Sequence, residues 1–128
     1  MQKPYRRIAV IDDDRCFLDF LTVFLDRLGY QTSTFSAPMK PEHIDELMQA
    51  DLILSDLFMP SFDGIEVLRS ALQHDQARPV VLMTGSTPDT AALFERMTTT
   101  LGARFFIAKT NIYDHLAALL NVLVGLPA

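Results

Sequence analysis

Residues that could bind a metal ion and a phosphoryl group each follow a short apolar run in this sequence. Four sets are placed in this way: Asp12-Asp13-Asp14, Asp56, Thr84 and Lys109. If each run is a buried parallel strand, all four sets lie at the carboxyl ends of the strands, the edge where open α/β sheets bind ligands. Carboxylates, a hydroxyl and an ammonium gathered there indicate a divalent cation and a phosphoryl group.

The acidic run brings three carboxylates together, which is costly unless a cation or a helix N-terminus offsets their repulsion. Asp13 or Asp14 could simply cap the helix that follows. Capping requires only one aspartate, so the others need another explanation. Mg²⁺, or another divalent cation such as Mn²⁺, prefers oxygen ligands. A site built from Asp12, Asp13 and Asp56 fits that preference.

Asp56 is the candidate phosphoacceptor, because a carboxylate beside Mg²⁺ can attack phosphorus and form an aspartyl phosphate. The Lys109 ammonium and the Thr84 hydroxyl would then donate to the phosphoryl oxygens. Each residue also has an ordinary alternative. Asp56 could begin a turn, Thr84 could cap the next helix, and Lys109 could be a solvated residue at a strand end. Their placement at successive strand ends favours a shared site.

Five runs of strand length must position these side chains. The candidate strands are residues 7–11, 31–35, 51–55, 79–83 and 104–108. All but the second are nearly continuous in apolar residues, as in parallel strands that are covered on both faces. The second run is polar and β-branched, which indicates an edge strand. The sequence therefore predicts an α/β fold of the (βα)5 type, with a doubly wound parallel sheet.

Segments with helical spacing lie between the strands. The first places Phe17, Leu18, Leu21, Phe24, Leu25 and Leu28 inward and should end at Gly29. A short helix is expected around 42–49, and a third from near Gly64. The fourth should begin after Thr87-Pro88, with an inner face of Ala92, Leu93, Met97 and Leu101. The fifth, about 112–124, is apolar over a broad stripe, which indicates either a partner surface or burial against a missing C-terminal segment.

Composition limits the class of protein. A chain of 128 residues fits a single domain, 1–128, with 125–128 as a terminus or the start of a linker. The apolar runs are shorter than the roughly 18 residues that a membrane helix requires. The single cysteine, Cys16, excludes an intramolecular disulfide and favours a cytoplasmic location, and its acidic neighbours favour packing over redox chemistry. A net charge of −5 argues against direct nucleic-acid binding by this domain.

In these residues the sequence resembles the receiver domain of two-component response regulators, over essentially the whole chain. That family has an acidic pair after the first strand, a phosphorylated Asp after the third, Thr or Ser after the fourth and Lys after the fifth. The matching residues are Asp12 and Asp13, Asp56, Thr84 and Lys109. The resemblance implies a flavodoxin-like sheet with strand order 2-1-3-4-5.

The same resemblance implies roles for individual residues. Asp13, Asp56 and the backbone carbonyl of Phe58 would bind Mg²⁺ directly, and Asp12 would act through water. Phe106, three residues before Lys109, would be an aromatic residue whose side chain changes position on phosphorylation. The alternative is that Phe106 is an ordinary core aromatic.

By resemblance, a histidine kinase or histidine phosphotransfer domain would donate the phosphoryl group to Asp56. The surface of the fourth helix, fifth strand and fifth helix would then change toward an output domain, a protein target or a second copy. Such a domain signals, and promotes only its own phosphorylation and dephosphorylation. Two other classes remain: a phosphohydrolase, which would need a second acid where Phe58 stands, and an interaction module that works without phosphorylation.

Three departures from the family pattern have expected consequences. Thr110 stands where proline commonly follows the lysine, so the Lys109-Thr110 loop should depart from the usual conformation. Gly85 should leave room beside the phosphoryl group. Phe58 and Ser86 should govern water access to Asp56, with the ring of Phe58 lengthening the life of the phosphorylated state.

Overall fold

Strands and helices alternate along the chain, in a computed structural model that describes residues 6–36, 41–59, 64–85 and 88–124. The strands are β1 (Arg7–Ile11), β2 (Gln31–Phe35), β3 (Leu52–Asp56), β4 (Val80–Thr84) and β5 (Phe105–Ala108). The helices are α1 (Arg15–Arg27), α2 (Pro41–Leu47), α3 (Gly64–His74), α4 (Pro88–Thr100) and α5 (Ile112–Val124), with a short 3-10 turn, η1 (Lys109–Asn111), before α5.

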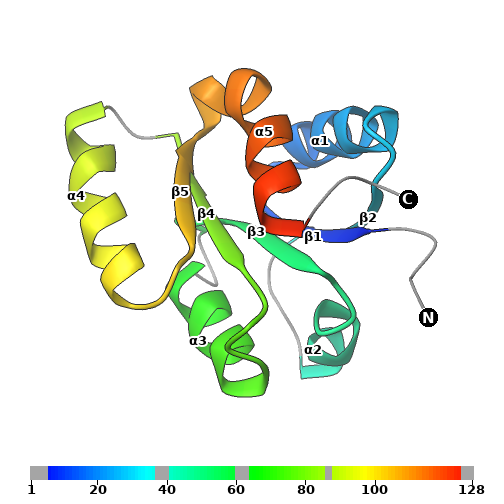
Figure 1. The fold of residues 1–128 in the computed structure, drawn as a ribbon, viewed down its shortest axis with the longest axis horizontal. Coiled ribbons are helices and arrows are strands. Elements are labelled where there is room, and N and C mark those ends of the chain that lie inside the picture. The colour runs from blue at the N-terminus through cyan, green and yellow to red at the C-terminus, as the bar shows by residue number, and fades with distance from the viewer. Residues whose placement is uncertain (1–5, 37–40, 60–63, 86–87, 125–128) are drawn as a thin grey trace.

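The strands form one parallel sheet in the order β2-β1-β3-β4-β5 (Figure 1). This arrangement confirms the predicted α/β fold and its strand order. Because all the strands run in one direction, their carboxyl ends meet at a single edge of the sheet. The predicted edge strand, β2, lies at one side of the sheet. Its side chains are less buried than those of the other strands.

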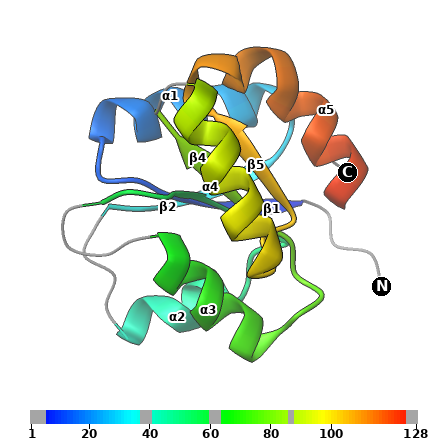
Figure 2. The same cartoon turned by 90° about the vertical axis from the view of Figure 1, so that its left-hand side faces the viewer.

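Helices cover both faces of the sheet. Figure 2 shows α1 and α5 on one side and α2 and α3 on the other, while α4 lies beside β5 (Figure 1). Alternate strand residues supply the two cores: Val10 and Leu54 point to the α1 and α5 side, whereas Ile11 and Ile53 pack with α2 and α3. Both faces of the central strands are thus buried, which is why their sequences are continuous in apolar residues.

The strand boundaries differ slightly from the prediction. The third and fourth strands begin and end one residue later than expected, so Asp56 and Thr84 are the last residues of β3 and β4. Lys109 follows β5 directly. This shift leaves the polar side chains at the same edge of the sheet, because each still stands at the carboxyl end of its strand.

The first helix ends as predicted, with Gly29 at a φ of 95°, a conformation that only glycine adopts without strain. Cys16, in its first turn, is exposed and makes no disulfide. The interpretation of this cysteine as a packing residue is therefore wrong, because Cys16 is exposed whereas Leu18 and Leu21 of the same helix are buried. The expectation that it takes no part in redox chemistry stays a prediction.

The predicted inner face of the fourth helix is also wrong. Its four proposed residues are all exposed: Ala92, Leu93, Met97 and Leu101. Phe94 packs against the core instead, and Thr98 is buried. The Thr98 hydroxyl donates to the carbonyl of Phe94 (2.7 Å), which satisfies it within the helix and allows burial of a polar residue. The apolar row on α4 therefore faces outward.

The broad apolar stripe of α5 is largely accounted for by packing. Leu116 and Leu120 are fully buried, and Leu119 and Leu123 pack against the same core. Val122 and Tyr113 remain exposed on the outer side. The predicted end of this helix at Gly125 lies outside the described residues. Among the described helices, none has the length and hydrophobicity needed to span a membrane.

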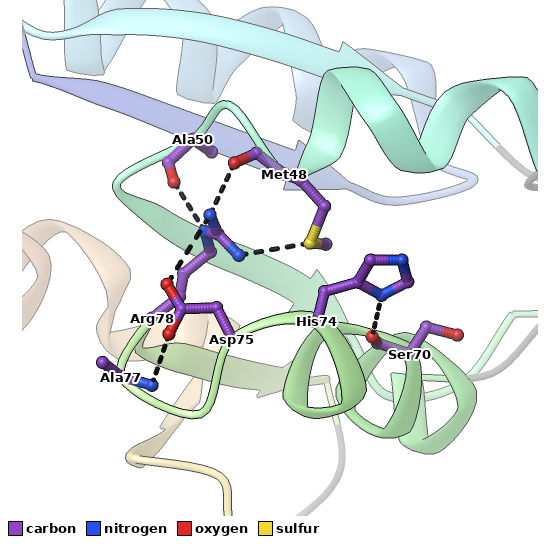
Figure 3. Close-up of polar contacts among 7 residues, drawn as sticks. All are labelled: Met48, Ala50, Ser70, His74, Asp75, Ala77 and Arg78. Carbon is purple, nitrogen blue, oxygen red and sulfur yellow. Dashed lines mark hydrogen bonds and ion pairs between the residues drawn. The ribbon is translucent and has the colours of Figure 1, made fainter.

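Arg78 ties two loops together at the amino ends of the strands (Figure 3). Its guanidinium donates to the backbone carbonyls of Ala50 (2.8 Å) and Met48, and lies 3.1 Å from the Met48 sulfur. Asp75 lies 3.9 Å away on the loop before β4. Because Ala50 precedes β3 and Arg78 precedes β4, this contact fixes how the two central strands enter the sheet, at the end opposite the acidic residues.

Candidate functional site

The acidic run begins where β1 ends and turns directly into α1. One carboxylate oxygen of Asp12, Oδ1, accepts a hydrogen bond from the backbone N–H of Asp14 (2.9 Å). Asp14 in turn caps α1 by accepting from the backbone N–H of Phe17 (3.2 Å). The capping alternative is thus confirmed for Asp14. The local structure leaves Asp12 and Asp13 to face the end of β3.

Three carboxylates meet at the edge of the sheet. Oxygens of Asp12, Asp13 and Asp56 lie within 4.8 Å of one another. Asp12 and Asp56 are buried, whereas Asp13 is exposed. Asp12 directly follows β1 and Asp56 ends β3, and these two strands are neighbours in the sheet. Parallel pairing of β1 and β3 therefore brings together aspartates that are far apart in the sequence.

Lys109 places a positive charge against this cluster. Its ammonium lies 2.7 Å from Oδ2 of Asp12 and 3.6 Å from Oδ1 of Asp56. The ammonium also lies 4.6 Å from the centre of the Phe17 ring. The side chain of Lys109 is mostly covered, with 21% exposed. The lysine therefore does more than occupy a solvated strand end: it bridges the two buried carboxylates.

The cluster is unfavourable for negative charge. The pKa of Asp56 is raised from 3.8 to about 6, first by burial and second by the charge of Asp12, while Lys109 acts in the opposite direction. Burial likewise raises the pKa of Asp12, opposed by contacts with Lys109 and the N–H of Asp14. One ammonium does not offset the charge of three carboxylates, so a bound cation would stabilise this arrangement.

The donor set suits a hard divalent cation. All three candidate ligands are carboxylates, one of them open to solvent, and such cations bind through oxygen and retain water. Burial first, and the charge of Asp12 second, raise the pKa of Asp56, so a cation bound at this point would favour its ionised form. These residues therefore fit a divalent metal ion.

Thr84 lies beside the cluster as the last residue of β4. It is buried, and its partner in the register of β4 and β5 is Ala108, the residue before Lys109. Residue 85, a glycine, follows at the edge. A Cβ atom built on Gly85 would have no neighbour within 4 Å among the described residues. The expectation that this glycine leaves room for a phosphoryl group stays a prediction. Ser86, the other residue expected to govern water access, lies outside the described residues.

The two phenylalanines predicted to act near the site, Phe58 and Phe106, lie in different environments. Phe58 follows Asp56 by two residues, is half-exposed, and packs edge-on against Phe94 of α4, with ring centres 4.9 Å apart. Phe106 of β5 is half-buried against the core on the α2 and α3 side. Metal binding by the Phe58 carbonyl and a switch role for Phe106 stay predictions.

Two of these contacts, Phe17 with Lys109 and Phe94 with Phe58, could not be predicted from the sequence. The sequence places Phe17 among several inward residues of the first helix, and no motif distinguishes Phe94. Both are apolar residues at helical spacing, which is the ordinary pattern of a core. Their positions beside Lys109 and Phe58 depend on how α1 and α4 lie against the strand ends.

Comparison with known proteins decides the family. The sequence model of the response regulator receiver domain matches residues 8–121. The chain belongs to the response regulator receiver domain family. This assignment covers both cores and every candidate site residue, and it agrees with the strand order of the receiver fold. The chain is therefore a receiver domain of the kind found in two-component signalling.

Two curated relatives show how this receiver domain relates to longer proteins. It is 33% identical over 87 residues to the DNA-binding response regulator MtrA of Mycobacterium tuberculosis, covering 68% of this chain and 38% of that protein. It is 33% identical over 116 residues to the transcriptional regulatory protein FixJ of Bradyrhizobium diazoefficiens, covering 89% of this chain and 54% of that protein. The receiver domain thus spans about half or less of these relatives.

A solved structure shares the fold of this receiver domain. The response regulator TrrA of Thermotoga maritima, solved in complex with Mg²⁺-BeF, superposes with a TM-score of 0.74 at 21% identity, covering 93% of this chain and 99% of that one.

Proposed function

We propose that Asp56 accepts a phosphoryl group from a histidine kinase or a histidine phosphotransfer domain. The observation that carries this proposal is the position of Asp56 within 4.8 Å of two further carboxylates and 3.6 Å from the Lys109 ammonium. A nucleophilic carboxylate, a metal-binding acidic pair and a cation for phosphoryl oxygens are the parts that phosphoryl transfer requires.

In the proposed reaction, a carboxylate oxygen of Asp56 attacks phosphorus. The bond from phosphorus to the donor's imidazole nitrogen breaks, and its electron pair returns to that nitrogen. Mg²⁺, held by Asp12, Asp13, Asp56 and the backbone carbonyl of Phe58, would supply charge neutralisation for the transferring oxygens. Lys109 keeps its proton and pairs with a phosphoryl oxygen, and the Thr84 hydroxyl donates to another.

The proposed output surface consists of α4, β5 and α5. Exposed apolar side chains occur on these elements and on the residue that follows α4: Leu93, Met97, Leu101, Phe105 and Tyr113. An exposed row of this kind is typical of a surface that binds a partner. Movement of Thr84 and Lys109 toward a new phosphoryl group would shift this surface between two states, with Phe106 in the relay. Its partner would be an output domain, a protein target or a second copy.

The location and the activities of the domain follow from the same proposal. We infer a cytoplasmic signalling role, in which the domain promotes only its own phosphorylation and dephosphorylation. Phe58 occupies the position where a phosphohydrolase would need a second acid. The net charge of −5 disfavours direct contact between this domain and DNA, although MtrA is named as a DNA-binding protein.

Intact mass after incubation with Mg²⁺ and acetyl phosphate tests the proposal. We expect the mass of one phosphoryl group on the parent protein and none on Asp56→Asn, with EDTA preventing the addition. Asp19→Asn, an exposed aspartate on α1, is the matched control and should be modified normally. No addition to the folded parent protein would contradict the proposal and favour an interaction module that works without phosphorylation.

A further inference from the structure

Among the residues that the structure describes, three lie against the Lys109 ammonium, and two of them carry the carboxylates already described. Lys109 begins the η1 turn, which continues directly into α5. Its side chain is a flexible stem with a compact charge, and such a stem has many alternative conformations. The two carboxylates attract the ammonium but do not fix its direction of approach. The third neighbour is the ring of Phe17, 4.6 Å from Nζ.

The ring of Phe17 lies at a distance where a cation is attracted to an aromatic face. This attraction adds no net charge to the site. An acidic side chain in the same place would hold Lys109 more strongly, but it would also repel an incoming phosphoryl group. A ring also leaves the three N–H donors of the ammonium available for oxygens. Phe17 is therefore suited to hold Lys109 without competing for its hydrogen bonds.

The ring is itself held in place from both ends. The backbone N–H of Phe17 donates to Asp14, within the same turn that positions Asp12. Its ring lies 6.2 Å from that of Phe20, which in turn lies 4.7 Å from Tyr113 of α5. Tyr113 is four residues beyond Lys109 in the chain. The aromatic row thus begins at the lysine ammonium and returns to the helix that follows the same lysine.

We propose that Phe17 is a positioning residue for phosphoryl transfer to Asp56, because it holds the Lys109 ammonium beside both buried carboxylates. This inference rests on the proposed function of Asp56. In the proposed reaction, Phe17 would contact neither the Mg²⁺ held by the aspartates nor the phosphoryl group on Asp56. Its effect passes through Lys109, so Phe17 should matter for the phosphoryl group and not for the metal ion.

The test compares Phe17→Leu with Phe17→Tyr and with Phe24→Leu. Leucine keeps an apolar side chain and removes the aromatic face, whereas tyrosine retains the face. Phe24 lies on the same helix, with its ring 5.7 Å from Tyr113, but is not one of the rings that link Lys109 through Phe17 and Phe20 to Tyr113. It is therefore the matched control for loss of a ring on α1. The measurements are the rate of phosphorylation by acetyl phosphate at saturating Mg²⁺, the affinity for Mg²⁺ alone, and the affinity for beryllofluoride with Mg²⁺.

We expect Phe17→Leu to lower the phosphorylation rate and the beryllofluoride affinity about five-fold, the effect of losing one cation–π contact. The affinity for Mg²⁺ alone should not change. Phe17→Tyr should retain the parent rate, and Phe24→Leu should change none of the three quantities in the folded protein. If Phe17→Leu does not fold at the assay temperature, Phe17→Met replaces it under the same criteria.

Two results would overturn the inference. In one, the folded Phe17→Leu protein is phosphorylated at the rate of Phe24→Leu. In the other, Phe17→Tyr loses as much activity as Phe17→Leu, which would make side-chain shape rather than the aromatic face responsible. A parent protein that accepts no phosphoryl group would instead contradict the proposed function itself, and the inference with it.

Discussion

Gly64 lies directly against the backbone of Asp56. A Cβ atom at Gly64 would stand 2.6 Å from the carbonyl oxygen of Asp56 and 2.9 Å from the Cα of Leu57. The backbone N–H of Gly64 donates to the carbonyl of Leu57 (2.8 Å), which holds the start of α3 against the end of β3. The position of the candidate phosphoacceptor therefore depends on a residue without a side chain eight positions later.

Gly64→Ala should displace the end of β3, because both neighbours are backbone atoms and cannot move aside freely. We expect a loss of about 1–3 kcal/mol in the free energy of unfolding and a slower phosphorylation of Asp56. Urea denaturation and the acetyl phosphate assay measure the two effects. Gly85→Ala is the matched control for stability, since a Cβ there meets none of the described residues within 4 Å. Equal stability of the two variants would contradict the expected clash.

The raised pKa of Asp56 makes stability depend on pH. In metal-free protein, the ionised form is disfavoured by folding, because the folded pKa is about 6 and the ordinary value is 3.8. This carboxyl therefore costs nothing below 3.8, and its destabilising effect grows as the pH rises through about 6. Asn cannot ionise, so Asp56→Asn should be more stable than the parent at neutral pH, by up to about 3 kcal/mol.

Urea denaturation at a series of pH values, in the presence of EDTA, measures this difference. The advantage of Asp56→Asn should shrink as the pH falls from neutrality toward the ordinary value of 3.8. The exposed Asp19→Asn should show no such trend. Mg²⁺ should stabilise the parent more than Asp56→Asn. A difference that is constant over the whole pH range would show that the Asp56 carboxyl is not responsible.

Removal of the Phe58 ring should shorten the life of the phosphorylated state. The ring stands two residues after Asp56 and packs against Phe94, and the prediction is that it limits the access of water to the carboxylate. Phe58→Asn should speed hydrolysis of the phosphoryl group severalfold, because water gains access. Loss of phosphate after removal of acetyl phosphate is the measurement, with Phe94→Leu as a smaller disturbance. An unchanged hydrolysis rate in Phe58→Asn would exclude shielding by this ring.

Arg78 should contribute to stability without affecting the site. Arg78→Met removes charged hydrogen bonds to the carbonyls of Met48 and Ala50, and we expect a loss of about 2–4 kcal/mol in the free energy of unfolding. Arg69→Met changes an exposed arginine on α3 and should have little effect. Mg²⁺ affinity in the folded Arg78→Met protein should equal that of the parent. A lowered affinity would mean that the two ends of the sheet are coupled.

The fold could be predicted because its central strands are buried on both faces. Such strands require continuous apolar runs, and each run ends where a polar residue meets solvent or a ligand. The order of strands came from the family resemblance and is confirmed by the sheet. The one-residue shift of β3 and β4 arose because Asp56 and Thr84 continue the strand pairing although their side chains are polar.

The fourth helix shows where sequence pattern fails. Its outward face carries Leu93 and Met97, whereas Thr98 is buried with its hydroxyl bonded to the helix backbone. Prediction from an amphipathic pattern assumes that the row of apolar residues faces the core. In this helix Phe94 faces the core, whereas the row that contains Leu93 and Met97 is exposed. Only the packing of α4 beside β5 determines which side is covered.

The types of residue at each strand end, and hence the chemistry that the site can perform, follow from the order of residues along the chain. Tertiary structure alone decided that Lys109 meets Asp12 and Phe17, and that burial raises the pKa of Asp56. The reason is physical: residue types follow from local order along the chain, whereas Coulombic and desolvation energies depend on distances between side chains that separate strands and helices bring together.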